Sequence, residues 1–375
     1  MPKIFFIDPQ SYNNLSLYDK GVMCEFPKDN VIFFGSDLWN CDKMPNVEMH
    51  LWFHYNSFKN PIAKLLSYTR SLLKIAKYVN KNLPDLVHIQ WTRVMPIDIL
   101  FTKYLQSKKI KVIHTAHNVL PHNTGMKYKG QFEKYYNLVD HIIVHSELTK
   151  KEMISLFKLP SDKISVIPHG MIMIEADYKK VKDRILELKK LYNIEDKLVF
   201  SSLGAQSYYK GVDNIVEVWS NNSEFRDNPK CHLMIIGKNE GIDISPLKEV
   251  SNVTIIDERL DNVDFLSYIR LSDVILLPYR AISQSGVLFS ALSNNIPVLV
   301  SDVGGLSEPL KIADVGWNIG EPTKENLKKQ MLGLVQYREN VLEMKARKEE
   351  FQSVQKHYDW HRISKMTKKL YEKLI

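Results

Sequence analysis

The chain has 375 residues, 44% of them apolar and 25% charged, a balance that is ordinary for globular proteins and excludes disorder, collagen-like repeats and coiled coil as the main organisation. At about 150 residues per domain, this length predicts two domains. The net charge is +8, and 22 basic against 15 acidic residues place +7 of it in residues 1–175.

The first half of the chain alternates short apolar runs with amphipathic stretches. Strands are predicted at residues 3–7, 31–35, 86–90, 111–115, 141–145 and 164–168, and helices at residues 61–82, 98–108 and 147–157. Asp8 and Pro9 follow the first run at once, which is typical of a first strand and not of a signal peptide. The sequence contains no run of about 18 apolar residues, so we expect no membrane-spanning helix.

The second half of the chain repeats this alternation. Strands are predicted at residues 198–203, 232–236, 253–256, 274–277, 298–300 and 316–319, and helices at residues 179–192, 211–220, 260–271, 287–293 and 323–337. Asp359 is placed to cap an amphipathic helix at the end of the sequence.

Strand–helix alternation predicts an α/β fold with parallel sheets that helices cover on both faces. We expect two Rossmann-like, doubly wound domains that face each other across a cleft. Residues 1–172 with a helix at about 359–375 would form the first domain, and residues 173–358 the second. The alternative is one large open sheet with a long insertion. Ligands are expected outside the carboxyl ends of the strands.

Several common motifs are missing from the sequence. It contains no Gly-x-Gly-x-x-Gly, no phosphate loop, no His-Glu-x-x-His, no Cys-x-x-Cys and no Asp-x-Asp. Their absence argues against dehydrogenases, P-loop nucleotide hydrolases, zinc hydrolases and metal-dependent sugar transferases. The cysteines, Cys24, Cys41 and Cys231, are too few and scattered for a disulfide framework. We therefore expect a reducing, cytoplasmic environment and no metal.

Histidines follow the strand predicted at residues 111–115. His117 and Asn118 come just past its carboxyl end, and His122 lies beyond Pro121. A histidine at such an end can donate to a phosphate or hydroxyl, or move a proton near neutral pH. His117 is the catalytic candidate. The alternative is that these histidines only cap a loop.

Two further strand ends in the second half carry phosphate-binding features. After residues 198–203 come Gly204, which permits a tight turn, and Lys210, which can place a compact charge on a phosphate. After residues 274–277 a polar loop leads to a helix start whose N–H groups form an anion site. The residues predicted there to bind the donor are Gln284, Ser285, Gly286 and Val287. The alternatives are an ordinary surface lysine and a plain helix cap.

Together these motifs, in this order, resemble glycosyltransferase family 4, whose members have the GT-B fold. The resemblance covers essentially the whole chain. It implies a His after a strand of the first domain, a Lys-Gly pair before a helix of the second, and a closing helix that returns to the first domain.

The sequence departs from the family pattern in three places. Ile282 and Ser290 stand where many members have a pair of glutamates, the second of which holds the ribose. Residues 205–209 contain no arginine to accompany Lys210 on the diphosphate. The first domain lacks a glycine-rich loop and has Asn13 and Asn14 there, which we take with Asn118 and His122 as weak acceptor-binding candidates.

The resemblance implies a transferase that moves a sugar from a nucleoside diphosphate to a lipid-linked or polysaccharide acceptor, with retention and without a metal or other cofactor. Lys210 and the N–H groups of residues 285–287 would hold the diphosphate. We expect no nucleic-acid partner. The alternatives are a nucleotide-sugar 2-epimerase on the same fold and an inactive nucleotide-sugar-binding module.

The basic charge of the first half also predicts peripheral binding to an anionic membrane, on the inner face of the plasma membrane. The lysines in question are Lys103, Lys108, Lys109, Lys111, Lys127 and Lys129. The apolar residues expected to insert among them are Phe101, Tyr104, Met126 and Tyr128. The alternative is a lysine-rich surface exposed only to water.

Overall fold

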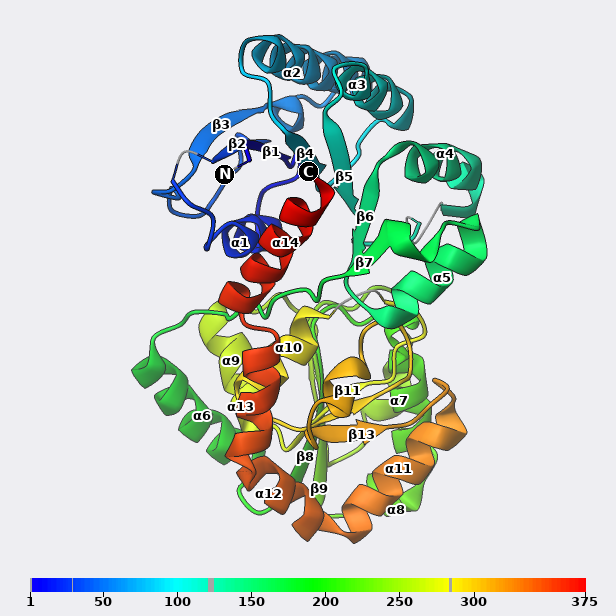
Figure 1. Ribbon diagram of the computed structural model, residues 1–375. Helices are drawn as coiled ribbons and strands as arrows, with labels where there is room; N and C mark the ends of the chain where they lie inside the picture. Colours follow the sequence, from blue (N-terminus) through cyan, green and yellow to red (C-terminus); the bar gives the residue numbers. More distant parts are fainter. Residues whose placement is uncertain (1, 29, 121–124, 283–284) are drawn as a thin grey trace. The chain divides into compact units, whose positions relative to one another are not determined.

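The structure, a computed structural model, describes residues 2–28, 30–120, 125–282 and 285–375. It divides into two compact units (Figure 1). The first unit comprises Met1–Gly170 and Tyr358–Ile375, and the second comprises Met171–His357. The sequence analysis placed these boundaries at residues 172 and 359.

A parallel sheet forms the centre of the first unit. Its strands are β1 (Ile4–Ile7), β2 (Val31–Ser36), β3 (Glu48–Phe53), β4 (Leu86–Ile89), β5 (Lys111–Thr115), β6 (His141–Val144) and β7 (Ile164–Val166). They lie in the order β3-β2-β1-β4-β5-β6-β7, and all neighbours are parallel. The strand order reverses between β1 and β4, which makes the carboxyl ends of these two strands the expected ligand position.

Helices cover both faces of this sheet. Side chains alternate between the two faces along each strand, so a strand of continuous apolar residues needs a covering layer on each side. The helices are α1 (Asn14–Val22), α2 (Pro61–Lys81), α3 (Met95–Ser107), α4 (Gly125–Leu138), α5 (Glu147–Phe157) and α14 (Trp360–Leu374). Phe5 and Ile7 of β1 share a core with α2, α3, α4 and α5. Ile4 and Phe6 point the other way, into a core with α1 and α14. The terminal helix, red in Figure 1, therefore completes the first unit.

The second unit is built on a separate parallel sheet. Its strands are β8 (Leu198–Leu203), β9 (Cys231–Ile236), β10 (Val253–Ile256), β11 (Val274–Leu277), β12 (Val298–Val300) and β13 (Gly316–Asn318). They lie in the order β10-β9-β8-β11-β12-β13, so the order reverses between β8 and β11. The helices are α6 (Tyr178–Tyr192), α7 (Val212–Ser220), α8 (Ser223–Arg226), α9 (Asn262–Leu271), α10 (Gly286–Ser293), α11 (Lys324–Gln336), α12 (Arg338–Ala346) and α13 (Lys348–His357).

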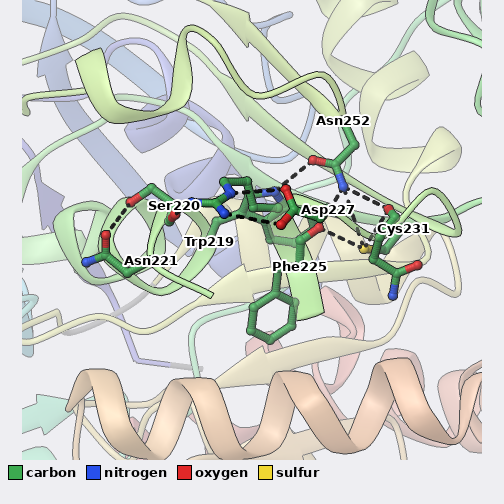
Figure 2. A network of polar contacts seen from close by, with 9 residues as sticks. Trp219, Ser220, Asn221, Phe225, Asp227, Cys231 and Asn252 are labelled. Carbon is green, nitrogen blue, oxygen red and sulfur yellow. Dashed lines mark hydrogen bonds and ion pairs between the residues drawn. The ribbon is translucent and has the colours of Figure 1, made fainter. Parts of the chain in front are cut away.

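Asn252, just before β10, fixes the edge of this second sheet (Figure 2). Its amide nitrogen donates to the carbonyl oxygens of Phe225 and Asn228, at 2.7 and 2.9 Å. Its amide oxygen accepts from the indole N–H of the buried Trp219 at 3.2 Å. One buried amide thus satisfies polar groups of the loop before β9 and of α7, which an apolar residue could not do.

The two-sheet prediction is confirmed, and the alternative of one large sheet is wrong. The strands predicted from continuous apolar runs are present, because a strand buried on both faces leaves that pattern. The sequence analysis missed β3, α1, α4, α8, α12 and α13. The sequence of β3, Glu-Met-His-Leu-Trp-Phe, is mixed because β3 is an edge strand whose residues are mostly half-exposed.

The face expected to insert into a membrane is not built as predicted. Phe101 is only 8% exposed, in the core between α3 and the sheet. The Tyr104 hydroxyl donates to the Ala76 carbonyl of α2 at 3.0 Å. Lys111 begins β5, at the opposite end of that strand from His117. Packing therefore removes both aromatic residues from the expected inserting surface. Met126 and Tyr128 of α4 are exposed.

Two glycines of the first unit enclose the Trp360 indole at the start of α14. A Cβ atom on Gly21 would lie 2.2 Å from a ring carbon of Trp360, and one on Gly170 would lie 2.4 Å away. We predict that Gly21→Ala lowers the free energy of unfolding by about 1–3 kcal/mol, because the indole must move. Urea unfolding measures this change.

Gly130→Ala on α4 is the matched control, since no atom lies within 4 Å of its Cβ position. It should leave stability unchanged or raise it by up to about 1 kcal/mol. If both variants behaved alike, the contact between α1 and α14 would not be the cause.

Candidate functional site

Polar side chains follow four adjacent strands of the first unit, where each strand ends. Gln90 follows β4, His117 follows β5, His145 follows β6 and His169 follows β7. Carboxyl ends of parallel strands share one edge of a sheet, so these side chains meet although 79 positions separate residue 90 from residue 169. We call them the strand-end cluster.

His117 is held at both ring nitrogens. Nε2 lies 2.9 Å from Oε1 of Gln90. Nδ1 lies 3.2 Å from Nε2 of His145, whose Nδ1 lies 2.9 Å from the Ile167 carbonyl oxygen. The His117 ring stacks on Trp91, with ring centroids 4.7 Å apart and an interplanar angle of 1°. The edge of Tyr18 closes a further side at 4.8 Å.

The hydrogen bonds of this cluster restrict its protonation. The Ile167 carbonyl only accepts, so His145 carries its proton on Nδ1, and a neutral His145 then accepts from Nδ1 of His117. The structure places the Gln90 oxygen at Nε2 of His117, and only a protonated Nε2 can donate to that oxygen. Two neutral rings therefore cannot hydrogen-bond at both nitrogens of His117 at once, and one of its two contacts is made without a shared proton.

Burial keeps these histidines neutral. The pKa of His117 lies well below its usual range, because burial disfavours the cation and His145 and His169 add repulsion. Burial lowers the pKa of His145 to about 4 and that of His169 to about 3. A neutral, doubly engaged His117 positions groups around it and offers Nε2 to a ligand only when Gln90 turns away.

The cluster extends to the terminal helix. Gln90 Nε2 lies 3.2 Å from Nε2 of the buried His88, and His88 Nδ1 is hydrogen-bonded to the Tyr371 hydroxyl of α14. His114, the other histidine of this region, is buried with Nδ1 3.0 Å from the Ile89 carbonyl. Both are buried, and His114 lies at the wall of the cavity beside His117.

A cavity of about 670 Å³ opens beside His117. Its walls come from the loop after β1, the loop after β4, the end of β5 and one side of α4. Polar and aromatic groups that line it include Gln10, Gln90, Trp91, Arg93, His117, Asn118, Tyr128 and Gln131. The indole N–H of Trp91 is buried and has no hydrogen-bond partner in the described part of the chain.

The weak acceptor-binding candidates have different positions. Asn118 lines the cavity, whereas Asn13 and Asn14 are exposed at the start of α1 and do not line it. His122 lies outside the described residues.

Sequence reasoning missed Gln90, His145 and His169. Gln90 and His145 are the last residues of the strands predicted at 86–90 and 141–145, and His169 follows the strand predicted at 164–168. Listing the polar residue at or just after the end of every predicted strand would have found them.

A buried carboxyl pair lies under the same edge of the first sheet. Asp8 follows β1 and Asp19 lies on α1, and neither is more than 1% exposed. Burial raises the pKa of Asp8 to about 7. The pKa of Asp19 is also raised, first by burial and then by the charge of Asp8. Repulsion between two neighbouring buried carboxylates favours the protonated form. Neither lines the cavity.

Three predicted donor-binding residues meet in the second unit. A Cβ on Gly204, whose φ is +85°, would lie 3.1 Å from Nζ of Lys210 and 3.6 Å from Val287. Lys210 is half-buried, and its ammonium forms no hydrogen bond or ion pair within the described residues. Burial lowers its pKa. The Tyr279 ring, 5.7 Å from Nζ, is its aromatic neighbour.

The turn that carries Lys210 is held from β11. Lys210 ends a short 3₁₀ turn, Tyr208–Lys210, and Gly211 then caps α7. Arg280 forms a two-point ion pair with Asp213 at 2.6 and 2.8 Å, and its guanidinium also donates to the Tyr208 carbonyl. Because its guanidinium is engaged in this way, Arg280 positions the turn and does not replace the arginine missing from residues 205–209.

The start of α10 forms the other side of this group. Ser285 is the N-cap, and its hydroxyl accepts from the Leu288 N–H at 3.3 Å. Gly286 is exposed, and no atom lies within 4 Å of its Cβ position. No described residue accepts from the Gly286 or Val287 N–H groups. Gln284 lies outside the described residues, and Ser290 is buried.

Among the described residues, no group of three or more His, Cys, Asp or Glu side chains could hold a metal ion. In the same ranges, no helix combines the length and the apolar character needed to cross a bilayer.

Comparison with known proteins identifies relatives for both units. The model of Glycosyltransferase Family 4 matches residues 44–172, and that of Glycosyl transferases group 1 matches residues 183–351. An uncharacterized glycosyltransferase of Methanocaldococcus jannaschii is 24% identical over 194 residues, which are 50% of this chain and 47% of that protein. TuaC of Bacillus subtilis, named for teichuronic acid biosynthesis, is 24% identical over 68% of this chain and 64% of its own.

Solved structures share the fold along the whole chain. The Anabaena protein HepE, solved with UDP, has a TM-score of 0.70 and 11% identity, covering 99% of this chain and 100% of its own. Sucrose-phosphate synthase of Thermosynechococcus elongatus has a TM-score of 0.68 and 16% identity. The match covers 100% of this chain and 99% of that protein. The described fold is therefore that of the GT-B glycosyltransferases, two Rossmann-like parallel α/β domains.

The buried histidines predict an acid-sensitive fold. The histidines with lowered pKa values are His88, His114, His117, His141, His145, His169 and His232. Below about pH 6.5 they take up protons in the unfolded chain but not in the folded one, so the free energy of unfolding falls as pH drops towards about 4. Melting temperatures across this range test the expectation.

The raised pKa of Asp8 acts in the opposite direction. The folded state keeps a proton that the unfolded chain loses above about pH 4, so this group destabilises the fold increasingly as pH rises through about 7. Asp8→Asn should therefore raise the melting temperature relative to the native chain more at about pH 8 than at about pH 5. A difference independent of pH would contradict the raised pKa.

Proposed function

The chain belongs to the GT-B glycosyltransferases, and we propose that it transfers a sugar from a nucleoside diphosphate to a polysaccharide or lipid-linked oligosaccharide, with retention and without a metal ion. One observation carries the proposal. The Lys210 ammonium is half-buried beside Gly204 and the start of α10, and it forms no ion pair among the described residues, although the charge of Glu240 acts on it. A cation desolvated in this way is stabilised when an anion binds.

The diphosphate is both the anchor of the donor and the leaving group. Its negative charge grows as the bond to the sugar breaks, so fixed positive potential stabilises the transition state more than the bound donor. Lys210 supplies a full charge, and the N–H groups of Gly286 and Val287 supply partial charges at a helix N-terminus. Gly204 and Gly286 leave room for the phosphates because neither has a side chain.

The relatives support this substrate class. HepE has been solved with UDP and with UDP-glucose, which agrees with a nucleotide-sugar donor. The name of TuaC points to a polysaccharide product. This chain spans about half and about two thirds of the lengths of the two curated relatives, so the acceptor is proposed from the chemistry of the first unit.

The cavity beside His117 suits a sugar acceptor. Trp91 offers an aromatic wall, and Gln10, Asn118 and Gln131 offer amide groups for hydroxyls. His117, which is neutral, would hold a sugar hydroxyl through Nε2 once Gln90 turns away, rather than act as a strong acid. We assign the acceptor to this cavity and the donor to the second unit.

The alternatives make different predictions. A 2-epimerase needs accessible acid and base groups, and the Asp8–Asp19 pair is buried away from the cavity. Incubation with a nucleotide sugar alone distinguishes the three cases: an epimerase converts it, a transferase consumes it only when an acceptor is present, and an inactive module does neither.

A panel of UDP-, GDP- and ADP-sugars in a thermal-shift assay tests donor binding directly. A ligand that binds only the folded state raises its melting temperature, so one nucleotide series should give a concentration-dependent increase. No increase with any nucleotide sugar or free nucleoside diphosphate would contradict the proposal.

Lys210→Ala should weaken donor binding by about 1.5–3 kcal/mol, the usual contribution of a charge-assisted contact, and slow transfer. Calorimetric titration with the nucleoside diphosphate measures the loss. Lys230→Ala, at an exposed position just before β9 in the same unit, is the control and should bind normally. Equal affinity in both variants would remove Lys210 from the site.

Gly286→Val should abolish donor binding while the fold survives, because the side chain enters open space where the phosphates would approach. Gly333→Val on α11 is the matched control, since its Cβ also meets no atom within 4 Å. Normal nucleotide binding by Gly286→Val would show that α10 does not face the donor.

His117→Ala should reduce the transfer rate by about 10²-fold, because the contact made in the transition state is lost. The affinity for the free nucleoside diphosphate should stay unchanged. His141→Ala is the control, because His141 is also buried but bonds only to Ser165 at the far end of β6. Full activity of His117→Ala would leave the cluster with a structural role only.

A further inference from the structure

Helix α2 has an apolar outer face that no part of its own unit covers. Its inner residues Tyr68, Leu72, Ile75 and Val79 are buried in the core of the first unit. On the opposite side Ile62, Leu66 and Leu73 are 68%, 53% and 59% exposed. At 3.6 residues per turn, these three side chains lie within about 40° of one another on the helix surface. They form what we call the outer stripe.

A strip of positive charge runs beside the outer stripe. Residues 49–84 contain six basic residues and no Asp or Glu. Four of the six, Arg70, Lys74, Lys77 and Lys81, lie along the side of α2 next to the stripe. None of them forms an ion pair within the described part of the chain. The charge is therefore uncompensated where the apolar groups are exposed.

A groove joins these features to the edge of the sheet. It has a volume of about 390 Å³ and lies between β3 and α2. Trp52, Phe58 and Leu66 form apolar walls, and Arg70 and Lys74 supply the charge. The Lys74 ammonium lies 3.9 Å from the Trp52 ring centroid. Apolar walls with cations at their border complement a molecule that has an acyl chain and a phosphate.

We propose that this face of α2 docks the protein on an anionic lipid bilayer, with the outer stripe inserted among acyl chains and Arg70, Lys74 and Lys77 at the lipid phosphates. A helix with one apolar and one basic strip lies in the membrane interface in this way. The charge favours lipid over a protein partner of ordinary composition, because all the cations share one sign. The inference does not rest on the transferase reaction.

Cosedimentation with phosphatidylcholine vesicles, with and without phosphatidylglycerol, tests the proposal. The protein should bind the anionic vesicles at low salt, and binding should fall at least about tenfold at high salt, where screening shortens the reach of each charge. Binding of equal strength to both vesicles, or no binding at low salt, would overturn the proposal.

Two variants assign the surface. The triple change Ile62→Ser, Leu66→Ser and Leu73→Ser and the double change Arg70→Glu and Lys74→Glu should each weaken vesicle binding by about tenfold or more. All five positions are exposed, so circular dichroism and melting temperatures should match the native chain.

Lys103→Glu with Lys108→Glu is the matched control, because it makes the same charge change on α3 and at its C-cap, on the surface expected from the sequence. It should retain most of the binding. An equal loss in this control would show that net charge alone, and not the α2 face, attracts the protein.

The outer stripe could also cover a second copy of the chain. Sedimentation velocity separates this case: a dimer that the triple serine change dissociates, without vesicle binding by the native chain, would assign the face to self-association and overturn the proposal. Because vesicle binding is measured without nucleotide sugars, its failure is distinguishable from a failure of the proposed reaction.

Discussion

Parallel strands that end along one edge of a sheet are the constraint on which this protein's chemistry depends. In the first sheet the strand order reverses between β1 and β4, and Gln10 and Gln90 follow those strands at the wall of the cavity. In the second sheet it reverses between β8 and β11, and Gly204 and Arg280 follow those strands. Where the strand order reverses, the connections from the two neighbouring strands lead to opposite faces of the sheet. This leaves a crevice at their carboxyl ends, in which side chains can contact a ligand.

Burial then gives the two units opposite electrostatic character. In the first unit it keeps the histidines neutral, so His117 is fixed by hydrogen bonds and not by charge. In the second unit burial lowers the pKa of Lys210, the charge of Glu240 acts in the opposite direction, and the ammonium forms no ion pair among the described residues. A diphosphate would complete the second arrangement, whereas neutral hydroxyl groups suit the first. This division of chemistry is consistent with separate acceptor and donor domains.

The proposed donor-binding turn is held in place by residues that do not themselves face the proposed ligand. Arg280 ties the Lys210 turn to α7 through Asp213. Gly211 brings this turn against the Pro278 carbonyl, where a Cβ would lie only 2.1 Å from the oxygen. The lysine is thus positioned by backbone contacts, and a favourable charge is kept in place without reorganisation when the ligand arrives.

The sequence by itself determined the elements and the order of the motifs. Buried parallel strands are continuous apolar runs, which is why β8, β11 and β12 were predicted at their residues. Gly204, Lys210 and Ser285 could be selected because local turn and cap chemistry depends on neighbours in the chain. Apolar runs, turns and helix caps depend on residues that are close together in the chain, and so they can be identified from the sequence.

Only the tertiary structure decided which of these residues meet and which surfaces stay exposed. His145 and Gln90 became partners of His117 because β4, β5 and β6 are neighbours in the sheet, a fact that no local spacing contains. Phe101 is buried, whereas Leu66 on α2 is exposed, although both are large apolar residues on amphipathic helices. Periodicity shows that a helix has an apolar face, but the packing of distant elements decides whether anything covers it.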